Sequence, residues 1–231
     1  ITGMNDALPE STAPVRRASG QALAIAFGVT VLTWAIGYVT HMPHVGAPAW
    51  LVFVLLVLAL VAGGWVTGRF TDRGWGGMTT IAIGAATINM LVVLAVVSQQ
   101  AIEEGDATVW LSIPGFFAAT WAIFVVGFFI ARRGGSQEKP RPAINWTFHF
   151  TLALVIATGF LLVAGGLVTG YRAGLSVPDW PNSFGTNMFL YPLSKMTGGI
   201  YYEHAHRLYG TLVGLGTMLL AIHLWRSDER K

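Results

Sequence analysis

Glu203 and His206 lie one helical turn apart and have side chains suited to proton transfer and metal binding. A helix brings residues i and i+3 onto one face, and the same rotation turns His204 elsewhere. A neutral imidazole at the outer end of a membrane helix suits heme iron as an axial ligand, and a carboxylate one turn earlier can orient a neighbour or carry a proton. Glu203 is therefore the candidate catalytic residue and His206 the candidate metal ligand. The alternative is an interfacial patch that simply faces water and headgroups.

A second candidate region precedes this pair. Residues 171–202 form a connection far longer than usual, and such loops are more often functional than not. The loop contains Asp179-Trp180-Pro181 and several Met and aromatic residues, so it is expected to lie on the membrane surface as an amphipathic lid. Such side chains suit a large flat apolar ligand, which makes Trp180 a candidate cofactor contact. The alternative is ordinary interfacial anchoring by Trp and Tyr.

Composition indicates where these residues must function. The 231-residue chain is 54% hydrophobic and 11% charged, against roughly 25% charged in an ordinary soluble domain. This excludes a water-soluble globule and a disordered chain. The absence of cysteine excludes a disulfide framework, a thiolate zinc site and a Cys-ligated iron–sulfur cluster.

The fold class predicted is all-α: a polytopic membrane helical bundle with six transmembrane helices. About 20 apolar residues are needed to cross a bilayer, and lipid requires the backbone to satisfy its own hydrogen bonds. Six stretches without Lys, Arg, Asp or Glu qualify: 21–39, 50–67, 78–97, 109–131, 148–169 and 208–225.

The basic residues predict the orientation. With both termini cytoplasmic, all Lys and Arg except Arg172, Lys195 and Arg207 fall inside, as the positive-inside rule requires. The net charge of +3 is thus a property of the membrane edge and predicts no nucleic-acid partner.

Four segments are expected along the chain: a polar N-terminal tail (1–20), a four-helix transmembrane extension (21–131), a cytoplasmic linker (132–147), and a helix pair with its long external loop (148–231). Three small-xxx-small pairs are expected to let helices pack closely, namely Gly64/Gly68, Gly166/Gly170 and Gly210/Gly214. His149 and His223 are expected to be interfacial.

The motifs together resemble a known family. The order Gly165-Gly166, Gly174-Leu175-Ser176, Asp179-Trp180-Pro181 and Glu203-x-x-His206-Arg207-Leu208 is similar to the first two helices and first external loop of the heme A synthase family, over about Phe148 to Trp225. That family oxidises a methyl group of heme O to the formyl group of heme A in the bacterial cytoplasmic or mitochondrial inner membrane.

The resemblance carries specific implications. His206 matches an axial heme ligand, Glu203 the acidic residue one turn before it, and Arg207 continues the cofactor-binding motif. It implies heme O as substrate, heme b as a possible second cofactor, the bilayer as environment, and heme O synthase or cytochrome oxidase assembly proteins as partners. Here the bacterial cytoplasmic membrane is expected.

The chain departs from the family in three ways. Val168-Thr169 stand where many members have Thr-Arg, the loop has no cysteine pair, and the helices that carry the family's further histidines do not follow. We therefore expect an incomplete chain that needs C-terminal helices or a partner chain, and that would not make heme A alone.

Two other functions remain open at this level. One is a non-enzymatic heme-binding or electron-transfer subunit of cytochrome b type, using His206 with His41 or His44. The other is a helical scaffold or transporter without a cofactor. Intramembrane charges usually mark transport pathways, and the six stretches have none; Asn89 fits hydrogen bonding between helices better.

Overall fold

A computed structural model describes residues 12–104, 107–133 and 143–227. Within these ranges, six helices are long and apolar enough to cross a membrane. They are α1 (Thr12–His41), α2 (Ala49–Phe70), α3 (Trp75–Glu104), α4 (Ser112–Arg133), α5 (Trp146–Gly170) and α6 (Gly198–Ser227). The expected helical bundle is confirmed to this extent. Residues 1–11 of the predicted tail and 134–142 of the predicted linker lie outside the described residues.

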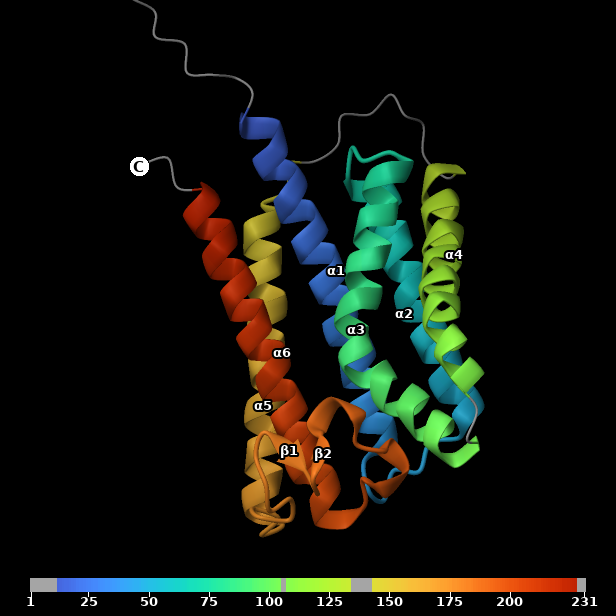
Figure 1. The fold of residues 1–231 in the computed structure, drawn as a ribbon. Helices are drawn as coiled ribbons and strands as arrows, with labels where there is room; N and C mark the ends of the chain where they lie inside the picture. The colour runs from blue at the N-terminus through green and yellow to red at the C-terminus, as the bar shows by residue number, and fades with distance from the viewer. Residues whose placement is uncertain (1–11, 105–106, 134–142, 228–231) are drawn as a thin grey trace, which may run out of the picture.

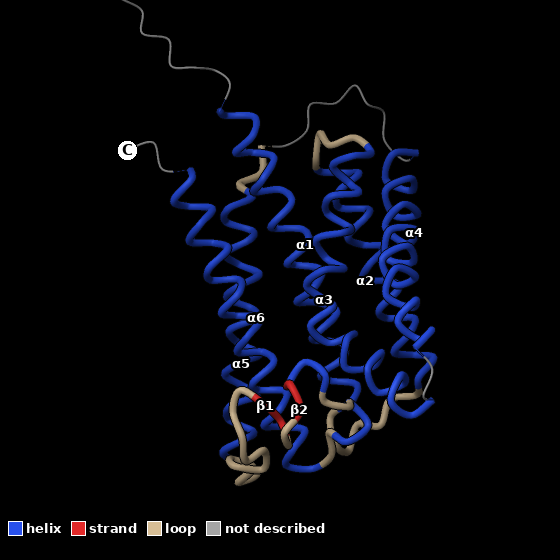
Figure 2. Tube along the Cα trace, viewed as in Figure 1, coloured by secondary structure: helices blue, strands red, loops and turns tan. Residues whose placement is uncertain are grey.

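Successive helices run in opposite directions, so the first described turn of α1 and the last of α6 lie at the same end of the bundle (Figure 1). The α5–α6 connection lies at the opposite end, together with the α1–α2 connection (Figure 1). It contains the short strands β1 (Asn182–Ser183) and β2 (Thr186–Asn187), while helix dominates everywhere else that is described (Figure 2).

α1 is the most buried of the six helices and packs against α2, α3, α5 and α6. Its Phe27 lies edge-on to Phe150 of α5, with ring centroids 5.4 Å apart. Gly216 of α6 faces the same ring, since a Cβ there would lie 2.5 Å from Phe27 Cζ. One hydrophobic core thus joins the first four helices to the α5–α6 pair.

Glycines give α2 and α4 a backbone-to-backbone crossing. A Cβ at Gly64 would lie 2.1 Å from the Phe124 carbonyl oxygen, and one at Gly127 would lie 2.0 Å from that of Val61. Gly68 also abuts α4, so the predicted packing role of the Gly64/Gly68 pair is confirmed. The same prediction is wrong for the other two pairs. A Cβ added to any of these four glycines would have no neighbouring element within 4 Å, at Gly166, Gly170, Gly210 or Gly214.

Buried polar side chains tie helices together. Asn89 Oδ1 of α3 accepts hydrogen bonds from Thr33 Oγ1 (3.1 Å) and Trp34 Nε1 (3.2 Å) of α1, which confirms the helix-bridging role expected for Asn89. The prediction that the His223 ring reaches the lipid headgroups is wrong. Its imidazole is buried, and its Nε2 shares a 3.0 Å hydrogen bond with Thr147 Oγ1 of α5. A helical partner therefore satisfies this ring in place of headgroups.

α6 begins earlier than the apolar run predicts, at Gly198 instead of Leu208. The first turns carry Glu203, His204 and Arg207, which precede the apolar stretch and which the one-turn spacing of Glu203 and His206 already takes as helical. In the structure these polar groups bond to the preceding loop. The loop therefore lets the helix start before its apolar stretch.

Candidate functional site

The connection between α5 and α6 is a folded cap at one end of the bundle. Asn182 pairs with Asn187 and Ser183 with Thr186, and the two residues between the strands, Phe184 and Gly185, have φ of 52° and 75°. Positive φ at both central positions is characteristic of the type I′ hairpin turn. Two 3₁₀ turns follow, η2 (Met188–Leu190) and η3 (Leu193–Lys195).

Asp179 holds this hairpin turn. Its two carboxylate oxygens accept hydrogen bonds from the backbone N–H groups of Phe184 (2.8 Å) and Gly185 (2.7 Å). The pKa of Asp179 is lowered below its usual value, chiefly by the hydrogen bond from the Gly185 N–H. The Phe184 N–H and the Arg207 charge also lower it. The acid expected in the loop is therefore a turn anchor that favours its ionised form.

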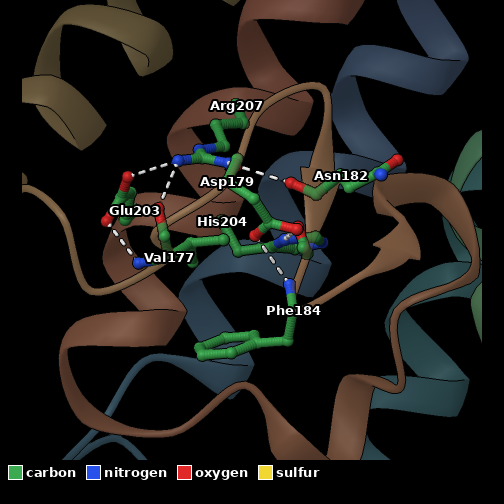
Figure 3. A network of polar contacts seen from close by, with 8 residues as sticks. Val177, Asp179, Asn182, Phe184, Glu203, His204 and Arg207 are labelled. Atoms are coloured by element: carbon green, nitrogen blue, oxygen red, sulfur yellow. Dashed lines mark hydrogen bonds and ion pairs between the residues drawn. The ribbon is translucent and has the colours of Figure 1, made fainter.

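Arg207 and Glu203 clamp the loop to α6. Arg207 Nη2 donates to Glu203 Oε1 (2.6 Å) and to the Val177 carbonyl (2.7 Å), and Nη1 donates to the carbonyls of Asp179 (2.5 Å) and Asn182 (3.2 Å). Glu203 Oε2 accepts the Val177 N–H at 2.8 Å. Figure 3 shows both side chains converging on this segment. Both Glu203 oxygens are thus engaged, and the guanidinium binds the backbone at three points.

His204 forms a third attachment that the sequence did not identify. The imidazole is fully buried, its Nδ1 shares a 3.1 Å hydrogen bond with Ser183 Oγ, and the Tyr191 ring centroid lies 5.2 Å away. Its Nε2 is a buried atom without a hydrogen-bond partner among the described residues. The helical spacing correctly predicts that His204 and His206 point to different sides of α6. That the His204 side faces the cap follows only from the folded loop.

His206 has different neighbours from Glu203. Its ring lies against α5: a Cβ at Gly165 would stand 3.1 Å from Nε2 and 3.3 Å from Cδ2. Among the described residues, no hydrogen-bond partner of this imidazole is found. The candidate ligand therefore lies between α5 and α6, beside a glycine whose missing side chain leaves it room.

Trp180 points away from the helices. The side chain is 78% exposed and precedes Pro181 across a cis peptide bond.

The cap also contacts the first four helices. Ser98 Oγ of α3 donates to the Leu190 carbonyl at 3.1 Å. The Tyr201 hydroxyl of α6 donates to the Tyr38 carbonyl of α1, and these two rings stack with centroids 5.7 Å apart. Tyr202 stacks on Tyr171, at the end of α5, at 4.5 Å. The ends of α1, α3, α5 and α6 on the side of the cap are therefore held in one arrangement by the loop and its aromatic neighbours.

The His206 imidazole alone could bind a metal only if a prosthetic group supplied most of the other ligands. Within the described ranges, no group of three or more His, Cys, Asp or Glu side chains converges to bind a bare ion. A single imidazole without a hydrogen-bond partner is the kind of donor that heme needs, because the porphyrin supplies four of the iron ligands and the protein needs to add only axial ones.

Comparison of the chain with models of protein families, with curated proteins and with solved structures finds no match.

Proposed function

We propose that this chain belongs to a heme A synthase-like membrane oxidoreductase in the bacterial cytoplasmic membrane, with His206 as an axial heme ligand. The observation that carries the proposal is the His206 imidazole. It lies at the cap end of α6 and has no hydrogen-bond partner among the described residues; its Nε2 packs beside Gly165, so the ring must turn away from α5 before that nitrogen can bind iron. The motif order in the sequence supports the same function.

The bound heme would supply the iron chemistry that oxidises the heme O methyl group. The protein's own residues hold and cover the site. Arg207 and Glu203 fix the 177–182 segment over the start of α6, and His204 fixes the hairpin through Ser183. A cap held in this way would exclude water from a bound cofactor. For Glu203 to move a proton at Oε2, the Val177 N–H must first release that oxygen.

A second axial ligand belongs to the proposal, supplied by C-terminal helices or by a partner chain. Lipid surrounds the exposed apolar faces of the six helices. Heme O synthase and cytochrome oxidase assembly proteins are the partners that such an activity requires for substrate delivery and product use.

One observation supports the cytochrome b type alternative. His41 Nδ1 lies 2.9 Å from the Gly37 carbonyl of its own helix. A histidine that donates its Nδ1 proton to a carbonyl keeps Nε2 free as a metal ligand. α1 also packs against α6 through Tyr38 and Tyr201, and His41 or His44 would be the partner of His206 in this alternative.

Reduced-minus-oxidised spectra of the purified chain test both functions. Loss of the heme signal in His206→Ala, with wild-type spectra in His41→Ala and His44→Ala, supports the heme A synthase-like proposal. Loss in His206→Ala and in His41→Ala or His44→Ala supports the cytochrome b type alternative. A wild-type spectrum in His206→Ala contradicts both.

A further inference from the structure

The hairpin part of the cap, residues 179–184, lies level with the start of the apolar stretch of α6. Arg207 Nη1 donates to the carbonyls of Asp179 and Asn182 (Figure 3). Arg207 directly precedes Leu208, where the apolar stretch begins. The hairpin part is therefore within about one helical turn, about 5 Å, of the depth at which α6 enters hydrocarbon.

α5 gives the same depth independently. Its Gly165 lies beside the His206 ring, since a Cβ there would stand 3.1 Å from Nε2. Leu162 and Val163, about 3–5 Å further into the bundle along α5, are both exposed. Apolar side chains exposed on a membrane-spanning helix face lipid, so hydrocarbon reaches almost to the level of the hairpin part.

Two aromatic side chains project from the hairpin part at this depth. Trp180 is largely exposed, and Phe184 remains exposed although its ring stacks on Tyr191 at 5.5 Å. Phe184 also has a φ of 52°, a left-handed conformation that glycine adopts more easily. A large apolar side chain thus stands where the backbone favours glycine, and contacts within the described chain leave much of it uncovered.

The backbone around both rings is fixed. The Asp179 carbonyl, one residue before Trp180, accepts from Arg207, and the Asp179 carboxylate accepts from the N–H groups of Phe184 and Gly185. The two rings therefore keep their place relative to α6, and their depth follows from that of the helix.

Leu175 lies in the same cap but farther from the membrane interior. Its side chain is 87% exposed. The neighbouring Ser176 packs on Gly199, where an added Cβ would lie 2.5 Å from Ser176 Oγ. Gly199 precedes His204 and Arg207, which hold the hairpin part, by about 8–12 Å along the axis of α6. Exposure alone therefore does not separate Leu175 from Trp180, but depth does.

From this geometry we propose that the cap is anchored in the lipid bilayer by Trp180 and Phe184, whose rings lie at the boundary between headgroups and hydrocarbon. Tryptophan is enriched at this boundary in membrane proteins, and lipid removes the exposed part of the phenylalanine ring from water. Leu175 lies outside the boundary. The proposal does not depend on heme binding, and it makes Trp180 a lipid contact in place of a cofactor contact.

The test uses the full chain, which has no cysteine, in nanodiscs of phosphatidylcholine and phosphatidylglycerol. A nitroxide spin label is attached to Trp180→Cys, Phe184→Cys or, as the matched control, Leu175→Cys. EPR saturation then compares relaxation by oxygen, which concentrates in hydrocarbon, with relaxation by a water-soluble nickel chelate. Labels at 180 and 184 are expected to respond more to oxygen, and the label at 175 more to the chelate.

Two other results overturn the proposal. A stronger response to the chelate at all three positions places the hairpin part in water. Protection from both reagents at 180 and 184 shows that a protein partner or a second copy of the chain covers these residues instead of lipid.

Fluorescence quenching tests the unlabelled Trp180 ring, and it decides the matter if a cysteine variant does not accumulate. Trp180→Phe keeps an aromatic ring at an exposed position. The emission lost in this variant, relative to the wild type, is expected to be quenched by lipid brominated near the headgroup and not by aqueous iodide. Quenching of that emission by iodide and not by brominated lipid contradicts the anchoring.

Discussion

Arg207 binds three backbone carbonyls and one carboxylate, and this gives a single side chain control over the 177–182 segment. The side chains of Arg207 and Glu203 are only 15% and 11% exposed. Charge-assisted hydrogen bonds are roughly twice as strong as neutral ones, and partial burial reduces screening by solvent. At the residue scale, the loop is therefore held chiefly by α6 itself.

Arg207→Ala is expected to release the loop, because four acceptors lose their donor at once. We expect about 2 kcal/mol less stability for the cap, which lies within the range of about 1.5–3 kcal/mol for hydrogen bonds that involve a charged group. Hydrogen exchange of the segment around Val177 measures this. Lys195→Ala is the control, an exposed cation of the same loop. Equal protection in wild type and Arg207→Ala would show that the clamp contributes nothing.

Residue-level prediction from the sequence succeeded only for some side chains. The one-turn spacing paired Glu203 with His206, but it could not show that the loop backbone at Val177 and the Arg207 side chain would already engage both Glu203 oxygens. The same spacing directs His204 away from His206 and says nothing of what it meets. Its neighbours are Ser183 and Tyr191, and such long-range contacts leave no local periodicity.

At the scale of elements, the hairpin and the helix crossings depend on a few positions. Asp179 supports the turn through two backbone N–H groups. Gly64 and Gly127 allow α2 and α4 to touch backbone to backbone. The hairpin turn and the α2–α4 crossing can each be tested by a separate substitution.

The hairpin should weaken in acid. The pKa of Asp179 is lowered in the folded loop, chiefly by the Gly185 N–H, so ionisation stabilises the fold at neutral pH and this contribution is lost as the pH falls through the lowered pKa. Protection of the Phe184 and Gly185 amides, followed by NMR against pH, should decline in that range. Asp179→Asn should show weaker protection and no such transition. An identical pH profile in the variant would exclude the carboxylate as its cause.

Gly64→Ala should strongly destabilise the bundle. Its Cβ would lie 2.1 Å from the Phe124 carbonyl oxygen, and overpacking of this kind costs about 1–3 kcal/mol or more. A lower thermal midpoint in detergent is expected. Gly115→Ala on α4 is the control, since no heavy atom lies within 4 Å of its added Cβ. Similar midpoints for the two variants would argue against a close α2–α4 crossing.

Of the three glycine pairs that small-xxx-small spacing predicts to pack, only one packs against another helix. The spacing shows that two glycines share a helix face, but not whether another helix covers that face. Gly64 and Gly68 meet α4, whereas Gly166 and Gly210 face open space. Gly165 and Gly216, which do make close approaches, lie outside the predicted pairs.

For the whole molecule, hydropathy sufficed to predict six membrane-length helices, because an apolar run long enough to cross a bilayer is a local property. It did not predict that α1 would be the central helix, since that depends on which apolar faces fit together. The positive-inside rule predicts an orientation in which the α2–α3 connection faces the cytoplasm and the α1–α2 connection faces outward.

The absence of cysteine makes this orientation directly testable. Val45→Cys, in the α1–α2 connection, should react with a membrane-impermeant maleimide in intact cells. Gly74→Cys, in the α2–α3 connection, should react only after the membrane is opened. Both positions are exposed in the structure. The reverse pattern would invert the topology and place the cap on the cytoplasmic side.

The central claim is that His206 ligates heme, and titration of the full chain with hemin in detergent measures this directly. The wild type is expected to bind hemin saturably with a Soret band typical of histidine ligation. His149→Ala, which removes an exposed imidazole bonded to the Asn145 carbonyl, should bind equally well, and His206→Ala should not saturate. Equal binding by wild type and His206→Ala would contradict the claim.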